Sequence, residues 1–261
     1  MFFPLMYTEG LTGFLDLCYF PPNNWENRIK KKLNLFAIWP DGDQWATQNV
    51  GTIEYGQSRQ IVSSDHQEKL KTGLCLIYPS LGILKNHISE LPKLPIWHTR
   101  IPEWRATTGF RNAKAQTSYQ GELFPLPNNA SLLTFHPFIQ YGGIENRLLV
   151  LNATTNPEII ESDIFLYDSK SKNRRGSEKV RTNSLTTIAL DKYNFMPHEL
   201  PAFVIPNMAG IPFGLGISLD GNMLSMEHTH PPASLVLFGN RFGVQGEVKK
   251  KWIGKLLENK K

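Results

Sequence analysis

The chain has 261 residues, a net charge of +5, 41% hydrophobic residues and 20% charged residues, which is the composition of an ordinary globular protein. Its basic residues fall in short runs, such as 30–32 and 249–251, without interleaved aromatic residues, so we do not expect nucleic-acid binding. The apolar N-terminus lacks a basic start and is broken by Pro4, which argues against a signal peptide or a membrane span and favours the cytoplasm.

Short strands are the dominant prediction along the chain, because apolar or alternating runs are separated by Gly, Pro, Asn and Asp. The predicted strands lie at residues 33–39, 50–55, 74–79, 146–152, 163–167, 184–190 and 202–206. The two cysteines, Cys18 and Cys75, stand within apolar runs and are interpreted as small core residues rather than a disulfide or a metal pair. This cysteine usage is typical of a reducing compartment.

Two later segments receive other predictions. The glycine-rich segment 206–216 is interpreted as a long turn between strands. Residues 248–261 give the clearest helical pattern, in which Trp252, Ile253, Leu256 and Leu257 share one face. We expect this helix to dock on the second half of the chain. The alternative is a basic amphipathic helix that touches an anionic membrane or a partner.

Short motifs recur about 130 residues apart, which predicts two tandem copies of one unit. The matched pairs include 98–102 with 228–232, 109–111 with 239–241, and 120–122 with 245–247. The predicted copies are residues 1–127 and 132–261, joined by a stiff linker with Pro125 and Pro127. Two copies of this kind are expected to pack about a pseudo-twofold axis.

The spacing of the strands favours antiparallel sandwiches over βαβ units. The run 146–152, the strand that ends at Asp168 and the Ser/Thr-rich strand from Ser184 resemble immunoglobulin-like or fibronectin-like modules in their rhythm. The expected fold class is therefore all-β, with two internally duplicated, immunoglobulin-like β-sandwich lobes and a short C-terminal helix.

The densest group of functional side chains contains Glu227, His228 and His230. The two histidines alternate, so on a strand they would project from one face and could act in acid–base chemistry or form half of a metal site. A third metal ligand would then come from His136 or His198. The other interpretation is that the histidine common to both copies, His98 and His228, has a structural role.

The first copy tests these alternatives, because it has His98 but carries Arg100 where the second copy has a histidine. Arginine does not ligate metals, so the first copy cannot hold the same metal site. His98 and Arg100 instead become candidate ligand-binding residues.

An aromatic face beside planar polar groups suits a sugar ring, which makes Trp104 and Arg105, near Tyr119, candidates for glycan binding. Burial of these aromatic residues in a core is the alternative. Arg241 is a further candidate for ligand binding. It and Arg111 are also the expected salt-bridge partners of Glu247 and Glu122.

Familiar catalytic signatures, such as a nucleophile elbow, a phosphate loop or a paired-cysteine zinc motif, do not occur in the sequence. The first hypothesis is therefore a non-catalytic β-sandwich protein that binds a glycan or a protein partner. The alternative is an enzyme that uses the second copy's Glu227, His228 and His230, with or without a metal. The sequence assigns neither a cofactor nor an oligomeric state.

Overall fold

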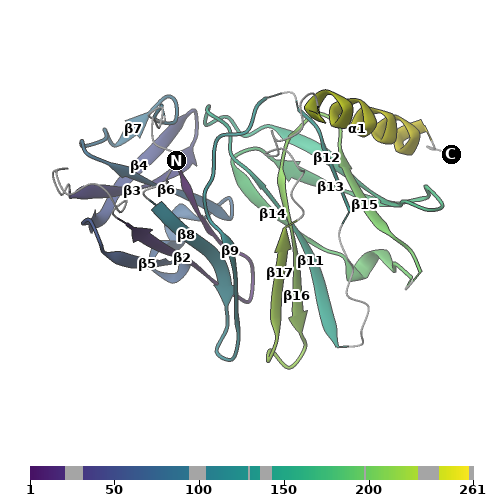
Figure 1. Ribbon diagram of the computed structural model, residues 1–261, viewed down its shortest axis with the longest axis horizontal. Helices are drawn as coiled ribbons and strands as arrows, with labels where there is room; N and C mark the ends of the chain where they lie inside the picture. Colours follow the sequence, from purple (N-terminus) through teal and green to yellow (C-terminus); the bar gives the residue numbers. More distant parts are fainter. Residues whose placement is uncertain are drawn as a thin grey trace.

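The computed structural model describes residues 1–20, 32–93, 104–128, 130–135, 143–196, 198–228 and 241–258, with the backbone alone at 241–245. Within these residues the chain is mostly β-structure, arranged in four antiparallel sheets with one α-helix and two short 3₁₀ helices (Figure 1). The predicted all-β class is therefore confirmed.

The first lobe, up to residue 128, has two sheets with the strand orders β1-β6-β3-β4-β7 and β5-β2-β8-β9. Its elements are β1 (Phe3–Met6), β2 (Thr12–Tyr19), β3 (Leu33–Asp41), β4 (Gln44–Ile53), β5 (Ser58–Val62), η1 (Ser63–Lys69), β6 (Leu74–Ser80), β7 (His87–Ile88), β8 (Trp104–Arg111) and β9 (Gln116–Gln120).

The second lobe, from residue 130, has two sheets with the strand orders β10-β15-β12-β13 and β14-β11-β16-β17. Its elements are β10 (Leu132–Phe135), β11 (Ile144–Asn152), β12 (Glu161–Asp168), β13 (Arg174–Arg181), β14 (Ser184–Ala189), η2 (Asp191–Tyr193), β15 (Pro201–Ile205), β16 (Ile211–Ser218), β17 (Leu224–His228) and α1 (Arg241–Glu258).

The two lobes have the same strand order once the short strand β7 is set aside. The sheet β1-β6-β3-β4 corresponds to β10-β15-β12-β13, and β5-β2-β8-β9 corresponds to β14-β11-β16-β17. A 3₁₀ helix precedes β6 in one lobe and β15 in the other. The predicted strands 33–39 and 163–167 fall on the corresponding strands β3 and β12, and the predicted strands 74–79 and 202–206 fall on β6 and β15.

Several of the recurring motifs do not occupy corresponding places. By strand order β9 corresponds to β17, and β9 ends at Gln120, whereas Gln245 lies in α1. His98 falls outside the described residues and precedes β8 in the chain, whereas His228 ends β17. The motif alignment is therefore wrong in this region, because short matches between polar residues do not determine which strands are equivalent.

Each lobe is sandwich-like, since its two sheets enclose an apolar core. In the first lobe this core contains Leu15, Leu35, Ile77 and Trp104, and in the second it contains Leu148, Val150, Leu166 and Phe203. A further core lies between the lobes, where the sheet β1-β6-β3-β4-β7 packs on the sheet β14-β11-β16-β17. Its members include Ile38, Leu76, Leu149, Leu151 and Phe213.

The packing of the lobes is head-to-tail, so the expected pseudo-twofold axis is wrong. A twofold axis would bring the same sheet of each lobe to the interface. The shared core instead joins the β1-containing sheet of the first lobe to the β11-containing sheet of the second, and these sheets do not correspond to one another.

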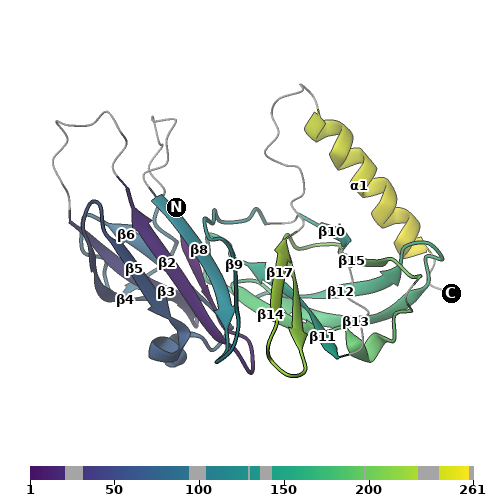
Figure 2. The same ribbon diagram turned by 60° about the horizontal axis from the view of Figure 1, so that its bottom comes forward.

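The helix α1 covers the outer face of the sheet β10-β15-β12-β13, on the side of the second lobe that lies away from the first lobe (Figure 2). Leu256 is fully buried against Tyr167, Ala202 and Val204, and Ile253 packs beside it. These contacts agree with the prediction of a docked helix, although α1 begins seven residues before the predicted start. No helix among the described residues is both long and apolar enough to cross a membrane.

The segment predicted as a long turn, 206–216, is largely the strand β16. Phe213, Leu215 and Ile217 alternate toward the core between the lobes, and the intervening Gly214 and Gly216 pair with β11 and β17. Glycine and proline obscured this alternation in the sequence. The cysteine prediction holds for Cys75, which is buried, whereas Cys18 is only partly buried. Burial raises the pKa of the Cys75 thiol to about 12.

Candidate functional site

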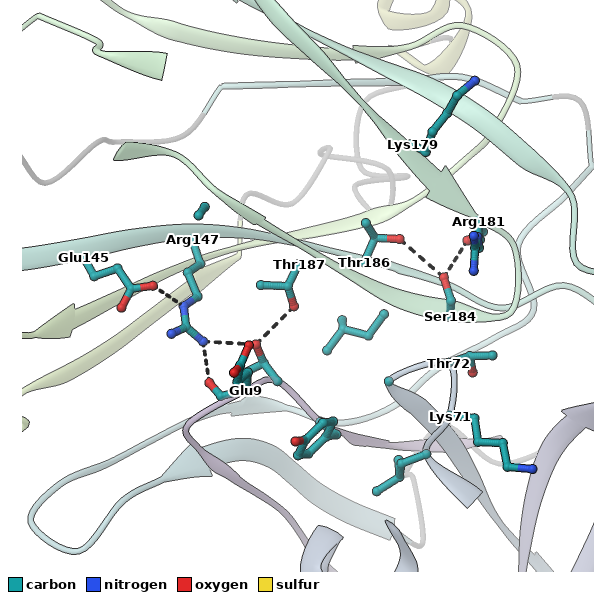
Figure 3. A pocket seen from close by; sticks show the side chains of 16 residues that line it. Glu9, Lys71, Thr72, Glu145, Arg147, Lys179, Arg181, Ser184, Thr186 and Thr187 are labelled. Atoms are coloured by element: carbon teal, nitrogen blue, oxygen red, sulfur yellow. Dashed lines mark hydrogen bonds and ion pairs between the residues drawn. The ribbon is translucent and has the colours of Figure 1, made fainter. Parts of the chain in front are cut away.

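A cleft of about 610 Å³ opens between the two lobes (Figure 3). We call it the interlobe cleft, and its lining comes from five places in the chain. These are Tyr7–Glu9 after β1, 70–73 before β6, Glu145 and Arg147 on β11, Lys179 and Arg181 on β13, and most of β14. The volume lies within the usual range of small-molecule sites.

Arg147 joins the two lobes along one side of this cleft. Its Nε donates to Glu145 Oε1 at 2.6 Å, and its Nη1 donates to the carbonyl of Glu9 at 2.6 Å and to Thr8 Oγ1 at 3.2 Å. The Thr8 hydroxyl also lies 3.1 Å from the hydroxyl of Thr187 on β14. A planar guanidinium is therefore held in place by groups from both lobes, with its side chain 15% exposed.

The backbones of the two lobes meet beside Gly73. The amide of Leu185 donates to the carbonyl of Thr72 at 2.9 Å, and the amide of Tyr7 donates to the carbonyl of Gly73 at 2.8 Å. Gly73 has a φ of 74°, and a Cβ atom there would lie 2.7 Å from the Leu185 carbonyl oxygen. Only glycine fits both this conformation and this distance, so the end of the cleft depends on it.

Charged groups of both signs line the cleft, with four cations and two carboxylates. Glu9 and Glu145 lie with Arg147 near one end of β14, and Lys71 lies near the other end, beside Thr72. The other two cations of the lining form ion pairs with carboxylates that do not line the cleft. Lys179 lies 2.9 Å from Asp163, and Arg181 lies 3.4 Å from Glu161.

The remaining polar groups in the lining are mostly hydroxyls. They belong to Thr8, Thr72, Ser184, Thr186 and Thr187. Tyr7 adds an aromatic residue that is 40% exposed. An aromatic ring, a planar ion pair and a row of hydroxyls can bind a polar ligand through stacking and directional hydrogen bonds.

The described members of the predicted histidine cluster, Glu227 and His228, lie at the opposite edge of the same sheet. In the strand order β14-β11-β16-β17, the cleft adjoins β14 and His228 ends β17. The His228 ring contacts Tyr119 and Phe213, each with ring centroids 5.1 Å apart. Glu227 is exposed and, as the adjacent residue of the strand, projects from the other face, so Glu227 and His228 do not converge.

His230 lies outside the described residues, so its convergence with His228 stays a prediction. His98, Arg100 and His136 also lie outside them, as does the side chain of Arg241. Within the described part of the chain, no three His, Cys, Asp or Glu side chains are grouped closely enough to hold a metal ion.

Trp104 is a core residue rather than part of a sugar-binding surface. It is 2% exposed and stacks on Tyr19, with the ring centroids 4.5 Å apart and the planes 12° apart. The adjacent Arg105 is exposed and donates to the Trp104 carbonyl at 3.3 Å. Trp104 and Arg105 therefore lie on opposite faces of the sheet, one in the core and the other exposed.

The expected salt bridge between Arg111 and Glu122 is not what the structure shows, whereas the one between Arg241 and Glu247 involves a side chain outside the described residues. Arg111 donates to Gln60 at 3.1 Å, and Glu247 pairs with Lys250 within α1 at 3.0 Å. Both carboxylate oxygens of Glu122 are buried and find no hydrogen-bond partner among the described residues. The matched motifs misled this prediction, because Gly121 follows a strand whereas Gly246 lies in a helix.

Sequence reasoning missed the interlobe cleft. Its residues are spread from Tyr7 to Ala189 and follow no spacing pattern. One signal was present, since Arg147 is the one charged residue of the predicted strand 146–152.

Comparison with known proteins does not identify a function for this cleft. No family model matches the chain, and neither a curated protein nor a solved structure is significantly similar to it.

Proposed function

We propose that the protein is a non-catalytic binding protein that holds a glycan in the interlobe cleft. In this proposal the lobes are two tandem copies of one immunoglobulin-like β-sandwich, and the site exists only where the copies meet. The shared strand order supports the duplication. The absence of catalytic signatures from the sequence supports a binding role.

The lining of the cleft is the observation that carries the proposal. Sugar hydroxyls need donors and acceptors in fixed directions, and the pair of Arg147 and Glu145 supplies both. The hydroxyls of Thr186 and Thr187 supply more of them. The exposed ring of Tyr7 provides a face on which the C–H side of a sugar ring can stack.

A glycan array followed by titration calorimetry tests the proposal. The parent protein is expected to bind a subset of glycans. Tyr7→Ala is expected to weaken that binding roughly tenfold, since about 1.4 kcal/mol of stacking is lost. Phe124→Ala is the matched control, because Phe124 is an aromatic side chain, 54% exposed, outside the cleft.

Two results would contradict the glycan proposal. One is an array without any binding glycan. The other is a glycan whose affinity is the same for the parent and for Tyr7→Ala. Recovery of a protein that binds the parent but not Tyr7→Ala would instead identify the cleft as a site for a protein partner.

A further inference from the structure

One sheet face is covered in both lobes, but by different elements. In the first lobe, the register pairs Met6 with Leu74 and Ile38 with Leu76 on the face that meets the second lobe. The corresponding pairs in the second lobe are Phe135 with Ala202 and Phe165 with Val204. These four residues lie beneath α1. The helix therefore occupies on the second lobe the surface that the second lobe occupies on the first.

The cover that α1 provides is much smaller than the cover that a lobe provides. Leu256 is the one fully buried residue among the α1 side chains that the structure describes. Ile253 packs beside it, and the Trp252 ring meets Phe135 edge to face at 6.0 Å. The corresponding face of the first lobe is buried in a core with members from all four strands of β14-β11-β16-β17.

The Tyr167 hydroxyl indicates that this face is not fully complemented by α1. Tyr167 is 1% exposed and belongs to the cluster beneath the helix. Its hydroxyl is buried and finds no hydrogen-bond partner in the described structure. A buried tyrosine hydroxyl normally has a partner, so its absence calls for an explanation.

We propose that α1 is a releasable cap over an interaction surface, and that the partner of this surface is a second copy of this chain. When α1 lifts, the faces that contain Phe135, Phe165 and Val204 pair between two copies. The same kind of face already binds a sheet of this chain in the first lobe. The proposal is independent of glycan binding, because no residue of the interlobe cleft belongs to the cluster beneath α1.

Assembly through this face stops at a dimer, because the opposite end of the molecule is polar. On the outer face of β5-β2-β8-β9, Gln60 donates to Asp16 at 2.8 Å and Arg111 donates to Gln60 at 3.1 Å. A head-to-tail filament would need an apolar face at that end. Two copies that use one identical face form a closed pair instead.

Sedimentation velocity of the full chain tests the proposal with a matched pair of variants. Leu256→Asp places a carboxylate against the apolar sheet face on which α1 packs. Because burying this charge is unfavourable, the helix is expected to leave the sheet. This variant is expected to enter a concentration-dependent monomer–dimer equilibrium, while the parent stays monomeric. Val248→Asp makes the same chemical change at a residue that is 50% exposed, and it is expected to behave like the parent.

Two further measurements identify the surface and separate dimerisation from misfolding. An excess of synthetic peptide 241–258 is expected to return Leu256→Asp to the monomer, because the peptide binds the sheet face that α1 covers in the parent. The double variant Leu256→Asp/Phe165→Glu is expected to be monomeric without the peptide, since a charge on the partly exposed Phe165 opposes pairing. A monomeric Leu256→Asp protein, aggregates that the peptide does not reverse, or a double variant that still dimerises would each overturn the proposal.

Discussion

Asp168 shows how a single residue fixes a turn in the second lobe. It is 4% exposed, and its carboxylate accepts hydrogen bonds from the amides of Lys170, Ser171 and Leu200. Burial alone would raise the pKa of this carboxyl, but these hydrogen bonds outweigh the burial and lower the pKa to about 2. The turn between β12 and β13 is thus tied to the residue before β15.

The lowered pKa predicts how the stability of the protein depends on pH. A depressed pKa stabilises the folded state above the ordinary value of 3.8, and this stabilisation is lost as the pH falls toward 2. At pH 7, Asp168→Asn is expected to lower the free energy of unfolding by about 2 kcal/mol. Near pH 2 the difference from the parent should largely vanish. Urea denaturation at several pH values measures it.

The exposed Asp43 provides the control for this prediction. Asp43→Asn should change the stability by less than about 0.5 kcal/mol at either pH. A stability difference for Asp168→Asn that stays constant between pH 7 and pH 2 would show that charge is not the cause.

At the scale of elements, Gly51 and Arg59 connect the two sheets of the first lobe. Arg59 on β5 donates to the carbonyls of Val50 and Thr52 on β4, at 2.7 and 2.9 Å. Gly51 lies between these carbonyls with a φ of 129°, next to a register shift between Leu35 and Phe36. The irregularity of the β3–β4 pair is therefore held by a side chain from the other sheet.

Gly51→Ala is expected to destabilise the protein by roughly 1–3 kcal/mol. A Cβ atom there would lie 2.2 Å from Arg59 Nη1, and the backbone conformation is unfavourable for alanine. Gly82→Ala is the control, since a Cβ atom at Gly82 meets nothing within 4 Å. Thermal melts compare the two variants, and equal midpoints would mean that Arg59 moves aside without cost.

Most buried strands could be predicted from the sequence, whereas those with mixed signals could not. The strands β3, β6, β12 and β15 were evident because their apolar runs are nearly continuous. The strand β16 was missed because glycine and proline outweighed its alternating apolar residues. The strands β2 and β8 were missed as well, since Gly13 and Gly109 interrupt them.

The whole molecule behaves as one unit in this structure, because the lobes share a core and a hydrogen-bonded contact. Trp45 Nε1 and the amide of Leu91, both in the first lobe, donate to the carbonyl of Thr155 in the second at 3.0 and 2.9 Å. Trp45 is 1% exposed. Without the other lobe, each lobe would expose the apolar sheet face that it contributes to the shared core.

A single cooperative unfolding transition is therefore expected, and Leu149→Ala tests it. This residue lies in the second lobe, within the shared core, and its truncation should cost roughly 2–5 kcal/mol. Tryptophan fluorescence reports mainly on the first lobe, which has five of the six tryptophans. The midpoint of the unfolding transition followed by fluorescence should fall together with the midpoint followed by circular dichroism. A fluorescence midpoint that does not change would mean that the lobes unfold independently.

The candidate site shows the limit of prediction at this scale. The cleft forms because turns at Tyr7 and Gly73 approach the edge strand β14, and that approach depends on how the lobes pack. Strand periodicity contains no information about such packing, and the motif alignment suggested a different symmetry. The sequence therefore predicted the sandwich-like lobes but directed attention to the β17 edge of the sheet, whereas the cleft lies at the β14 edge.

The strand β11 has a consequence for how the chain is built during synthesis. Leu148 and Val150 face one core while Leu149 and Leu151 face the other, and all four are at most 1% exposed. When β11 leaves the ribosome, the first lobe has already been translated, but β14 and β16 have not. We expect the finished first lobe to shield one side of β11 and so to act as a folding template for the second lobe.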